Sequence, residues 1–175
     1  MKIILKIIGT LLVIISLLLG SISVKRNFDD ATKKGVTTEE ITAFTTQVDS
    51  LKKINESLTG ASKDALNVEI EKAEKELSNL TTASTYKMVG YLLLVLCVLS
   101  LVSGFLLYKP DPKTIKIVLG LVVGVAAIAI VMSPNPVRGM TSGLPNRTIA
   151  MIMGAFSLAS ILIAYTIARK NQTTK

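Results

Sequence analysis

Four long apolar stretches without a charged side chain alternate with polar segments along the chain. They cover residues 7–24, 88–108, 117–132 and 148–168. A transmembrane helix needs about 20 apolar residues to cross a hydrocarbon core of roughly 30 Å. The pattern therefore predicts an all-α membrane protein with four transmembrane helices, in which the apolar stretches set the positions of the spans.

The polar segment between the first two stretches has the periodicity of two amphipathic helices. Thr37 and Glu40 match a capping box, which predicts a helix start at this point. Apolar residues then recur at spacings of three and four in two runs, separated by residues 59–61. Such seams are typical of coiled coils and predict an antiparallel coiled-coil hairpin. The predicted seam comprises Ile41, Phe44, Val48, Leu51, Leu58, Leu66, Ile70, Leu77 and Leu80.

The hairpin could project from the membrane or lie over the spans, and we favour projection. Two segments at its base are also open to two interpretations. Residues 25–36 either form a loop or extend the first span as helix up to Gly35. Residues 81–87 hold no helix breaker, so the second hairpin helix could continue directly into the second span.

These patterns divide the chain into four parts. Residues 1–24 form the first transmembrane helix, 25–87 the extracytoplasmic hairpin, 88–168 a three-helix transmembrane region, and 169–175 a cytoplasmic tail. The first stretch also resembles a signal peptide, because Ser21 and Ser23 have the small-x-small spacing of a cleavage site. Its 18 residues and the Lys25-Arg26 pair that follows favour an uncleaved signal anchor.

The net charge of +8 is concentrated beside the spans, because residues 25–87 hold ten basic and eleven acidic side chains. With the N-terminus inside, the short outer loop holds only Arg138 and Arg147. The short cytoplasmic segments then hold eight basic residues, namely Lys2, Lys6, Lys109, Lys113, Lys116, Arg169, Lys170 and Lys175. The positive-inside bias therefore predicts that both termini are cytoplasmic. We expect an integral protein of a prokaryotic cell membrane that contacts lipid and does not bind nucleic acid.

Small residues recur at four-residue spacing within the spans, a pattern that lets membrane helices approach closely. Gly104, Gly120, Gly124 and Gly154 are the glycines in the predicted packing positions, and Gly120 and Gly124 form the strongest match. We expect these positions to pack within one bundle. Contact between copies of the chain is the alternative.

Residues that carry reaction chemistry are scarce. The chain has no histidine, and its single cysteine, Cys97, lies in the middle of a span. No glycine-rich phosphate loop or metal-ligand spacing is present, so we expect no enzyme, cofactor, metal site or small-molecule substrate. The favoured hypothesis is a non-enzymatic subunit, scaffold or regulator of a larger membrane complex. Its hairpin would bind another membrane or extracytoplasmic protein, or a second copy. The alternative is a small oligomeric pore or channel-like protein.

Overall fold

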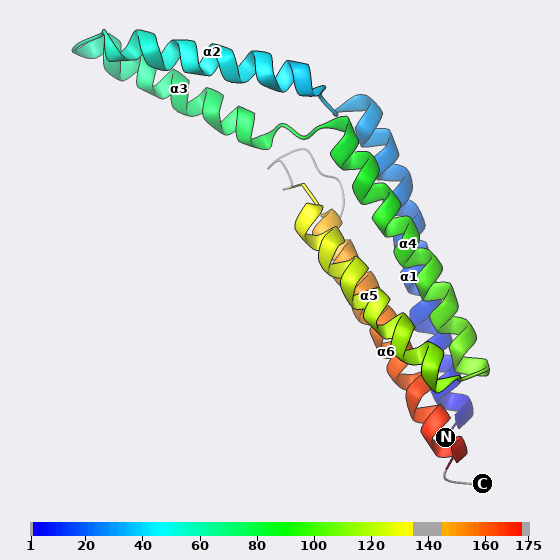
Figure 1. Cartoon of the computed structure of the whole chain (residues 1–175). Helices are drawn as coiled ribbons and strands as arrows, with labels where there is room; N and C mark the ends of the chain where they lie inside the picture. The colour runs from blue at the N-terminus through cyan, green and yellow to red at the C-terminus, as the bar shows by residue number, and fades with distance from the viewer. Residues whose placement is uncertain (1, 135–144, 173–175) are drawn as a thin grey trace.

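The computed structural model describes residues 2–134 and 145–172, with side chains up to residue 170. Predictions that concern Arg138 and Lys175 lie outside the described residues. The described part contains helices and an isolated bridge, with no strand. Figure 1 shows the helices in chain order: α1 (Lys2–Lys33), α2 (Thr38–Glu56), α3 (Ala61–Asn79), α4 (Ala83–Tyr108), α5 (Pro112–Met132) and α6 (Asn146–Gln172).

Helices α1, α4, α5 and α6 are long and apolar enough to cross a membrane, as the four apolar stretches predict. They pack side by side as one elongated bundle (Figure 1). Within it, α1 contacts α4 and α6, and α5 contacts α4 and α6. Helices α4 and α6 therefore lie between α1 and α5, and they hold the bundle together.

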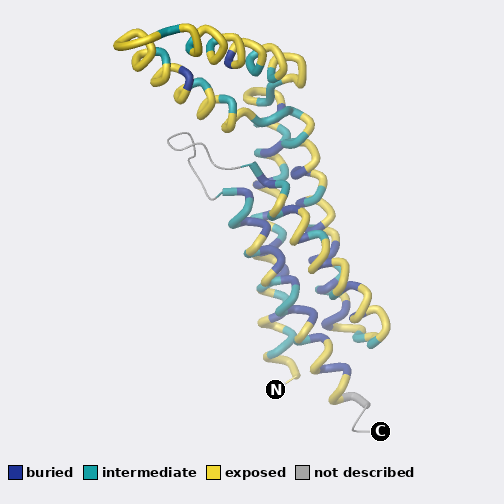
Figure 2. The backbone as a smooth tube through the Cα atoms, turned by 60° about the vertical axis from the view of Figure 1, so that its left-hand side comes forward, coloured by how far each residue is buried: buried dark blue, intermediate teal, exposed yellow. Residues whose placement is uncertain are grey.

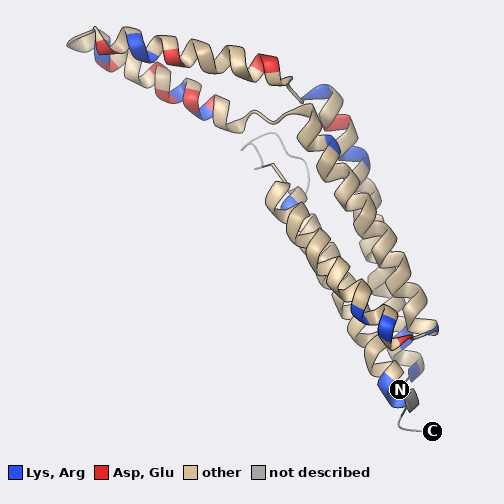
Figure 3. Cartoon of the chain, in the orientation of Figure 1, with Lys and Arg blue, Asp and Glu red and all other residues tan. Residues whose placement is uncertain are grey.

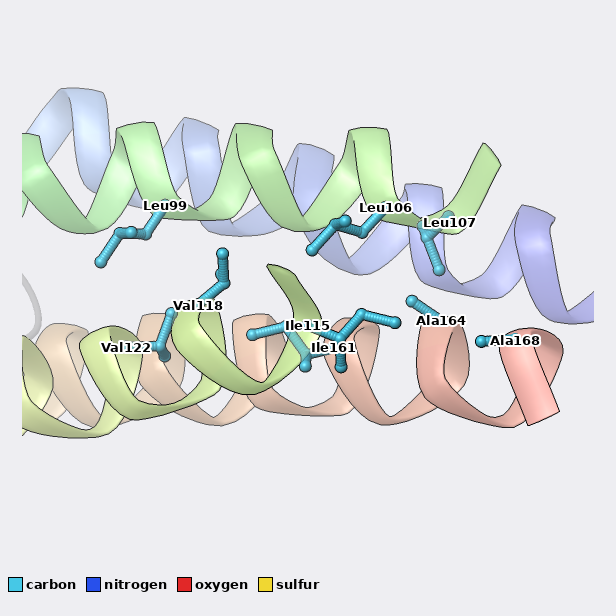
Figure 4. Close-up of a cluster of buried hydrophobic side chains, with 9 residues drawn as sticks. All are labelled: Leu99, Leu106, Leu107, Ile115, Val118, Val122, Ile161, Ala164 and Ala168. Carbon is cyan, nitrogen blue, oxygen red and sulfur yellow. The ribbon is translucent and has the colours of Figure 1, made fainter. Parts of the chain in front are cut away.

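The bundle core consists of two clusters of buried apolar side chains. One lies near the end that carries the termini and is drawn in Figure 4; it comprises Leu99, Leu106, Leu107, Ile115, Val118, Val122, Ile161, Ala164 and Ala168. The other lies nearer the hairpin and comprises Val89, Leu93, Leu96, Ala126, Ala129, Ile149, Ala150 and Met153. The outward faces of the same helices are also apolar, with Ile3, Leu18, Ile117 and Val131 well exposed. Helices that are apolar on every side are typical of a lipid environment.

Helices α2 and α3 form a hairpin that points away from the bundle (Figure 1). The capping box at its start is present, since Thr37 Oγ1 accepts from Glu40 N at 3.1 Å and Thr37 N donates to Glu40 Oε2 at 2.7 Å. Among the described elements, α2 and α3 contact only each other. Figure 2 shows their outer surfaces as exposed and their facing sides as more buried.

Of the two helix extensions considered at the hairpin base, one occurs and the other does not. Helix α1 continues without a break beyond residue 24 to Lys33, so the segment after the first span is helical. In contrast, α3 ends at Asn79 and α4 begins at Ala83, so no continuous helix joins the hairpin to the second span. The side chain of Thr82 caps α4 instead, accepting from Thr85 N at 3.1 Å.

Short backbone contacts close the base of the hairpin. Val36 N donates to Thr81 O at 3.2 Å, and Ala83 N donates to Val36 O at 3.2 Å. Gly35 lies directly against Ala83, where a Cβ atom would stand 2.5 Å from the Ala83 Cα. The chain therefore leaves the bundle and returns to it at adjacent points.

Two of the four glycines named as packing positions contact a neighbouring helix within the described residues. A Cβ on Gly154 would lie 3.0 Å from Ala126 Cβ, and one on Gly104 would lie 3.4 Å from Val13 Cγ1, so both glycines sit at helix contacts. Gly120 and Gly124 lie on the exposed face of α5, with no described atom within 4 Å of a Cβ at either position. The expectation that they pack inside the bundle is wrong for the described chain, because this face of α5 points away from α4 and α6. Contact between copies at these two residues stays a prediction.

Candidate functional site

The hairpin brings most of the predicted seam residues together between α2 and α3. Val48 and Ile70 are buried at its centre, with 2% and 7% of their surface exposed. The other helical seam residues are half-buried, namely Ile41, Phe44, Leu51, Leu66 and Leu77, and so is Leu58, just beyond the end of α2. Leu80 differs, because it follows the end of α3 and is exposed. Burial of these apolar side chains supplies the main stabilisation of the hairpin.

Polar side chains also join the two hairpin helices. Lys52 Nζ lies 2.6 Å from Glu74 Oε1, and Asn55 Nδ2 donates to Asn67 Oδ1 at 2.6 Å. The hydrogen bond and charge of Glu74 raise the pKa of Lys52 above its ordinary value. Because both members of the ion pair are exposed, water screens it, and its main effect is on the relative register of the helices.

The outward face of α3 carries a hollow with a volume of about 440 Å³. Val68, Glu71, Lys72 and Lys75 line it, and their spacing places all four on the side of the helix opposite the seam. Val68 is 57% exposed, and Ile54 on α2 is also exposed. The hollow thus combines an uncovered apolar side chain with both signs of charge.

A chain of buried hydroxyl groups links three of the spans. Ser100 of α4 lies 2.9 Å from Ser16 of α1 and 2.6 Å from Ser157 of α6, measured between Oγ atoms, and all three residues are fully buried. Hydrogen bonds between membrane helices contribute about 0.6 kcal/mol each on average. In the sequence, Ser16 and Ser100 belong to the pattern of small residues at four-residue spacing, which does not indicate that their hydroxyl groups pair.

A second polar cluster joins α1 to the start of α6 near the hairpin end of the bundle. Asn146 Nδ2 donates to Asn27 Oδ1 at 2.9 Å, and Ser23 Oγ donates to Asn146 Oδ1 at 3.3 Å. Asn27 is fully buried, and its Nδ2 donates to Ser23 O at 2.8 Å. Asn146 precedes the fourth apolar stretch, a position typical of an N-cap, but it is the first residue of α6 and its side chain bonds to α1. Because a buried side-chain amide needs hydrogen-bonding partners, this cluster fixes the position of the start of α6 relative to α1.

The described residues contain no group of three or more potential metal-ligating side chains. The burial of Ser100 and Asn27 is accounted for by hydrogen bonds between helices, as described above. These hydrogen bonds can hold α1, α4 and α6 in a fixed arrangement. Among the described residues, the hollow on α3 is a concave part of the hairpin surface.

The fold defines the class of the protein: an all-helical chain whose four long apolar helices make it an integral membrane protein. Comparison with protein-family models, curated proteins and solved structures finds no significant match to the chain. Function must therefore be argued from the geometry itself.

Proposed function

We propose that this chain is a non-enzymatic membrane subunit, scaffold or regulator that docks a partner protein through its α2–α3 hairpin. The observation that carries the proposal is that the hairpin stands clear of the spans and contacts only itself among the described elements. A helical pair of this kind, held away from lipid on two short connections, presents both helices to whatever lies beside the membrane.

The proposal places the hairpin on the extracytoplasmic side and both termini in the cytoplasm. Its support is the concentration of basic residues at the end of the bundle where α1 begins and α6 ends (Figure 3). Because Cys97 is the only cysteine, a Cys97→Ser background allows single new thiols to be placed. In intact cells, a membrane-impermeant maleimide should label Ser57→Cys at the hairpin tip. It should label Lys113→Cys, in the first turn of α5, only after permeabilisation. The opposite labelling pattern would invert the topology.

Within the hairpin, we assign docking to the outward face of α3. The hollow there is lined by Val68, Glu71, Lys72 and Lys75, and it lies opposite the seam, so a partner can cover it without separating α2 from α3. An exposed valine between charged residues is suited to a partner helix that offers an apolar side chain flanked by charges. Such a helix would bury Val68 and leave the charged residues at the rim.

The test is cross-linking in native membranes, followed by purification of the full chain in mild detergent. Val68→Asp should remove the cross-linked partner while leaving the hairpin helical, because this side chain lies outside the seam. Ala43→Asp adds the same charge to an exposed position on α2 and should keep the partner. Leu51→Asp and Leu77→Asp should lose both the hairpin and the partner. A chain that is isolated without a partner, or whose seam variants behave as the wild type, would refute the proposal.

A further inference from the structure

An apolar groove runs along the bundle surface between α1 and α4, near the end that carries the termini. It has a volume of about 250 Å³ and is lined by Thr10 and Val13 of α1 and by Leu101, Gly104, Phe105 and Tyr108 of α4. Phe105 is 75% exposed and Leu101 is 47% exposed, so both side chains stand out from α4 as one wall. Gly104 has no side chain, and this leaves the floor of the groove open.

The dimensions of the groove fit one lipid chain. Leu101 and Tyr108 are seven residues apart on α4, which corresponds to about 10 Å at the rise of an α-helix. One leaflet of the hydrocarbon core is about 15 Å deep. Because Tyr108 is the last residue of α4, the groove begins at the membrane surface and runs inward.

Polar groups cluster only at the surface end of the groove. Tyr108 Oη lies 3.0 Å from Thr10 Oγ1, and the ammonium group of Lys6 lies 5.2 Å from the centre of the Tyr108 ring. This cation–π contact holds a positive charge beside the mouth of the groove. Figure 3 shows further basic residues gathered at the same end of the bundle.

We propose that this groove is a binding site for an anionic phospholipid. One acyl chain lies over Gly104 between Val13 and the wall formed by Leu101 and Phe105. The negatively charged headgroup lies against Lys6, with the hydroxyl groups of Thr10 and Tyr108 as hydrogen-bonding partners. The positive charge of Lys6 favours an anionic headgroup, and the apolar floor of the groove favours contact with an acyl chain. The site rests on the membrane embedding of the spans and is independent of what the hairpin binds.

The full chain in nanodiscs of zwitterionic lipid provides the test. A trace of phosphatidylglycerol with a photoreactive acyl chain is cross-linked, and phosphatidylcholine with the same chain serves as the comparison. The label should concentrate on residues 101–108 and 10–13. Labelling of this groove by the anionic lipid should exceed that by the zwitterionic lipid about fivefold, the factor expected for one basic residue near an anionic headgroup.

Three variants separate the parts of the site. Gly104→Leu fills the floor and should abolish groove labelling, whereas Gly120→Leu, at an open position on α5, should leave it unchanged. Lys6→Gln should remove the preference for the anionic lipid while keeping the chain contact. Phe105→Ala removes an exposed wall without disturbing the core, so it tests the groove even if Gly104→Leu does not fold. Label spread evenly over the outer faces of all four spans, or unchanged labelling in Phe105→Ala, would overturn the proposal.

Discussion

Gly35 should be the glycine whose replacement by alanine disturbs the hairpin base most. A Cβ at this position would lie 2.5 Å from Ala83 Cα and 2.7 Å from Ala31 O. Ordinary contacts to a Cβ begin at 3.4 Å, so α1 and α4 would have to separate by about 1 Å. Both of these neighbouring atoms belong to the backbone, and no change of side-chain rotamer can move them away.

Two opposing contributions determine how much Gly35→Ala destabilises the hairpin base. Inserting a methyl group into a closely packed position costs about 1–3 kcal/mol. Replacing glycine by alanine also restricts the unfolded chain, which offsets about 0.4–1 kcal/mol. From the middle of each range, the net expectation for Gly35→Ala is a loss of about 1.3 kcal/mol at the base, which corresponds to a factor of about 9 in the local opening equilibrium.

Hydrogen exchange of the purified chain in detergent measures this directly. The amides of Val36 and Ala83 donate across the base, so their exchange should accelerate by the stated factor. Gly124→Ala is the matched control, because a Cβ there meets only open space. The reasoning fails if Gly35→Ala leaves exchange at both amides unchanged, or if Gly124→Ala accelerates it equally.

Three further predictions concern capping and hydrogen bonding. Ser100→Ala should destabilise the bundle by about 0.6–1.7 kcal/mol in denaturant unfolding, while the exposed Ser21→Ala should not. Thr37→Ala should cost the hairpin about 1 kcal/mol, measured as an earlier loss of helical circular dichroism on heating. Hydrogen bonds from Thr114 lower the pKa of Asp111 below its ordinary value, so its contribution to stability is present above that value and is lost as the pH falls through the lowered pKa. Thr114→Val removes the hydroxyl donor and keeps the backbone donor, so it should weaken this acid-dependent step in the unfolding midpoint.

The spans and the hairpin could be predicted because each depends on a local pattern. Charged side chains are excluded from the hydrocarbon core, so their absence from residues 88–108 nearly fixes α4. The capping box at Thr37 and the spacing of Val48 and its neighbours similarly fix α2. In both cases the signal lies within one helix, and tertiary contacts are not needed to interpret it.

The break between α3 and α4 was less predictable. Residues 80–82 contain neither glycine nor proline, and the strongest local signals for ending a helix are therefore missing. The break depends on the Thr82 side chain, which bonds to Thr85 N, and on Val36, which bonds to the backbone on both sides of Thr82. The second contact comes from a distant part of the sequence.

The role of each small residue depends on its neighbours. Gly104 and Gly120 occur in similar four-residue patterns, yet one contacts α1 and the other faces outward. Ser16 and Ser100 are 84 residues apart, and only the packing of α1 against α4 brings their hydroxyl groups together. Recurring serines at matching depths in several spans were the available signal for this pairing. They do not specify which faces meet.

The polar contacts of α6 have a consequence for the order in which the membrane part is assembled. Asn27 of α1 accepts from Asn146, and Ser100 of α4 pairs with Ser157, so polar residues of α1 and α4 gain partners from a helix that the ribosome makes after both of them. Until α6 arrives, the amide of Asn27 lacks this partner at the hairpin end of the bundle. Helices α1 and α4 can meet early through Ser16 and Ser100, but their contacts with α6 form only after α6 has been made. Helix α6 thus completes the polar contacts of the two earlier helices, and a chain cut before residue 146 would lack the partners of Asn27 and Ser100 that α6 supplies.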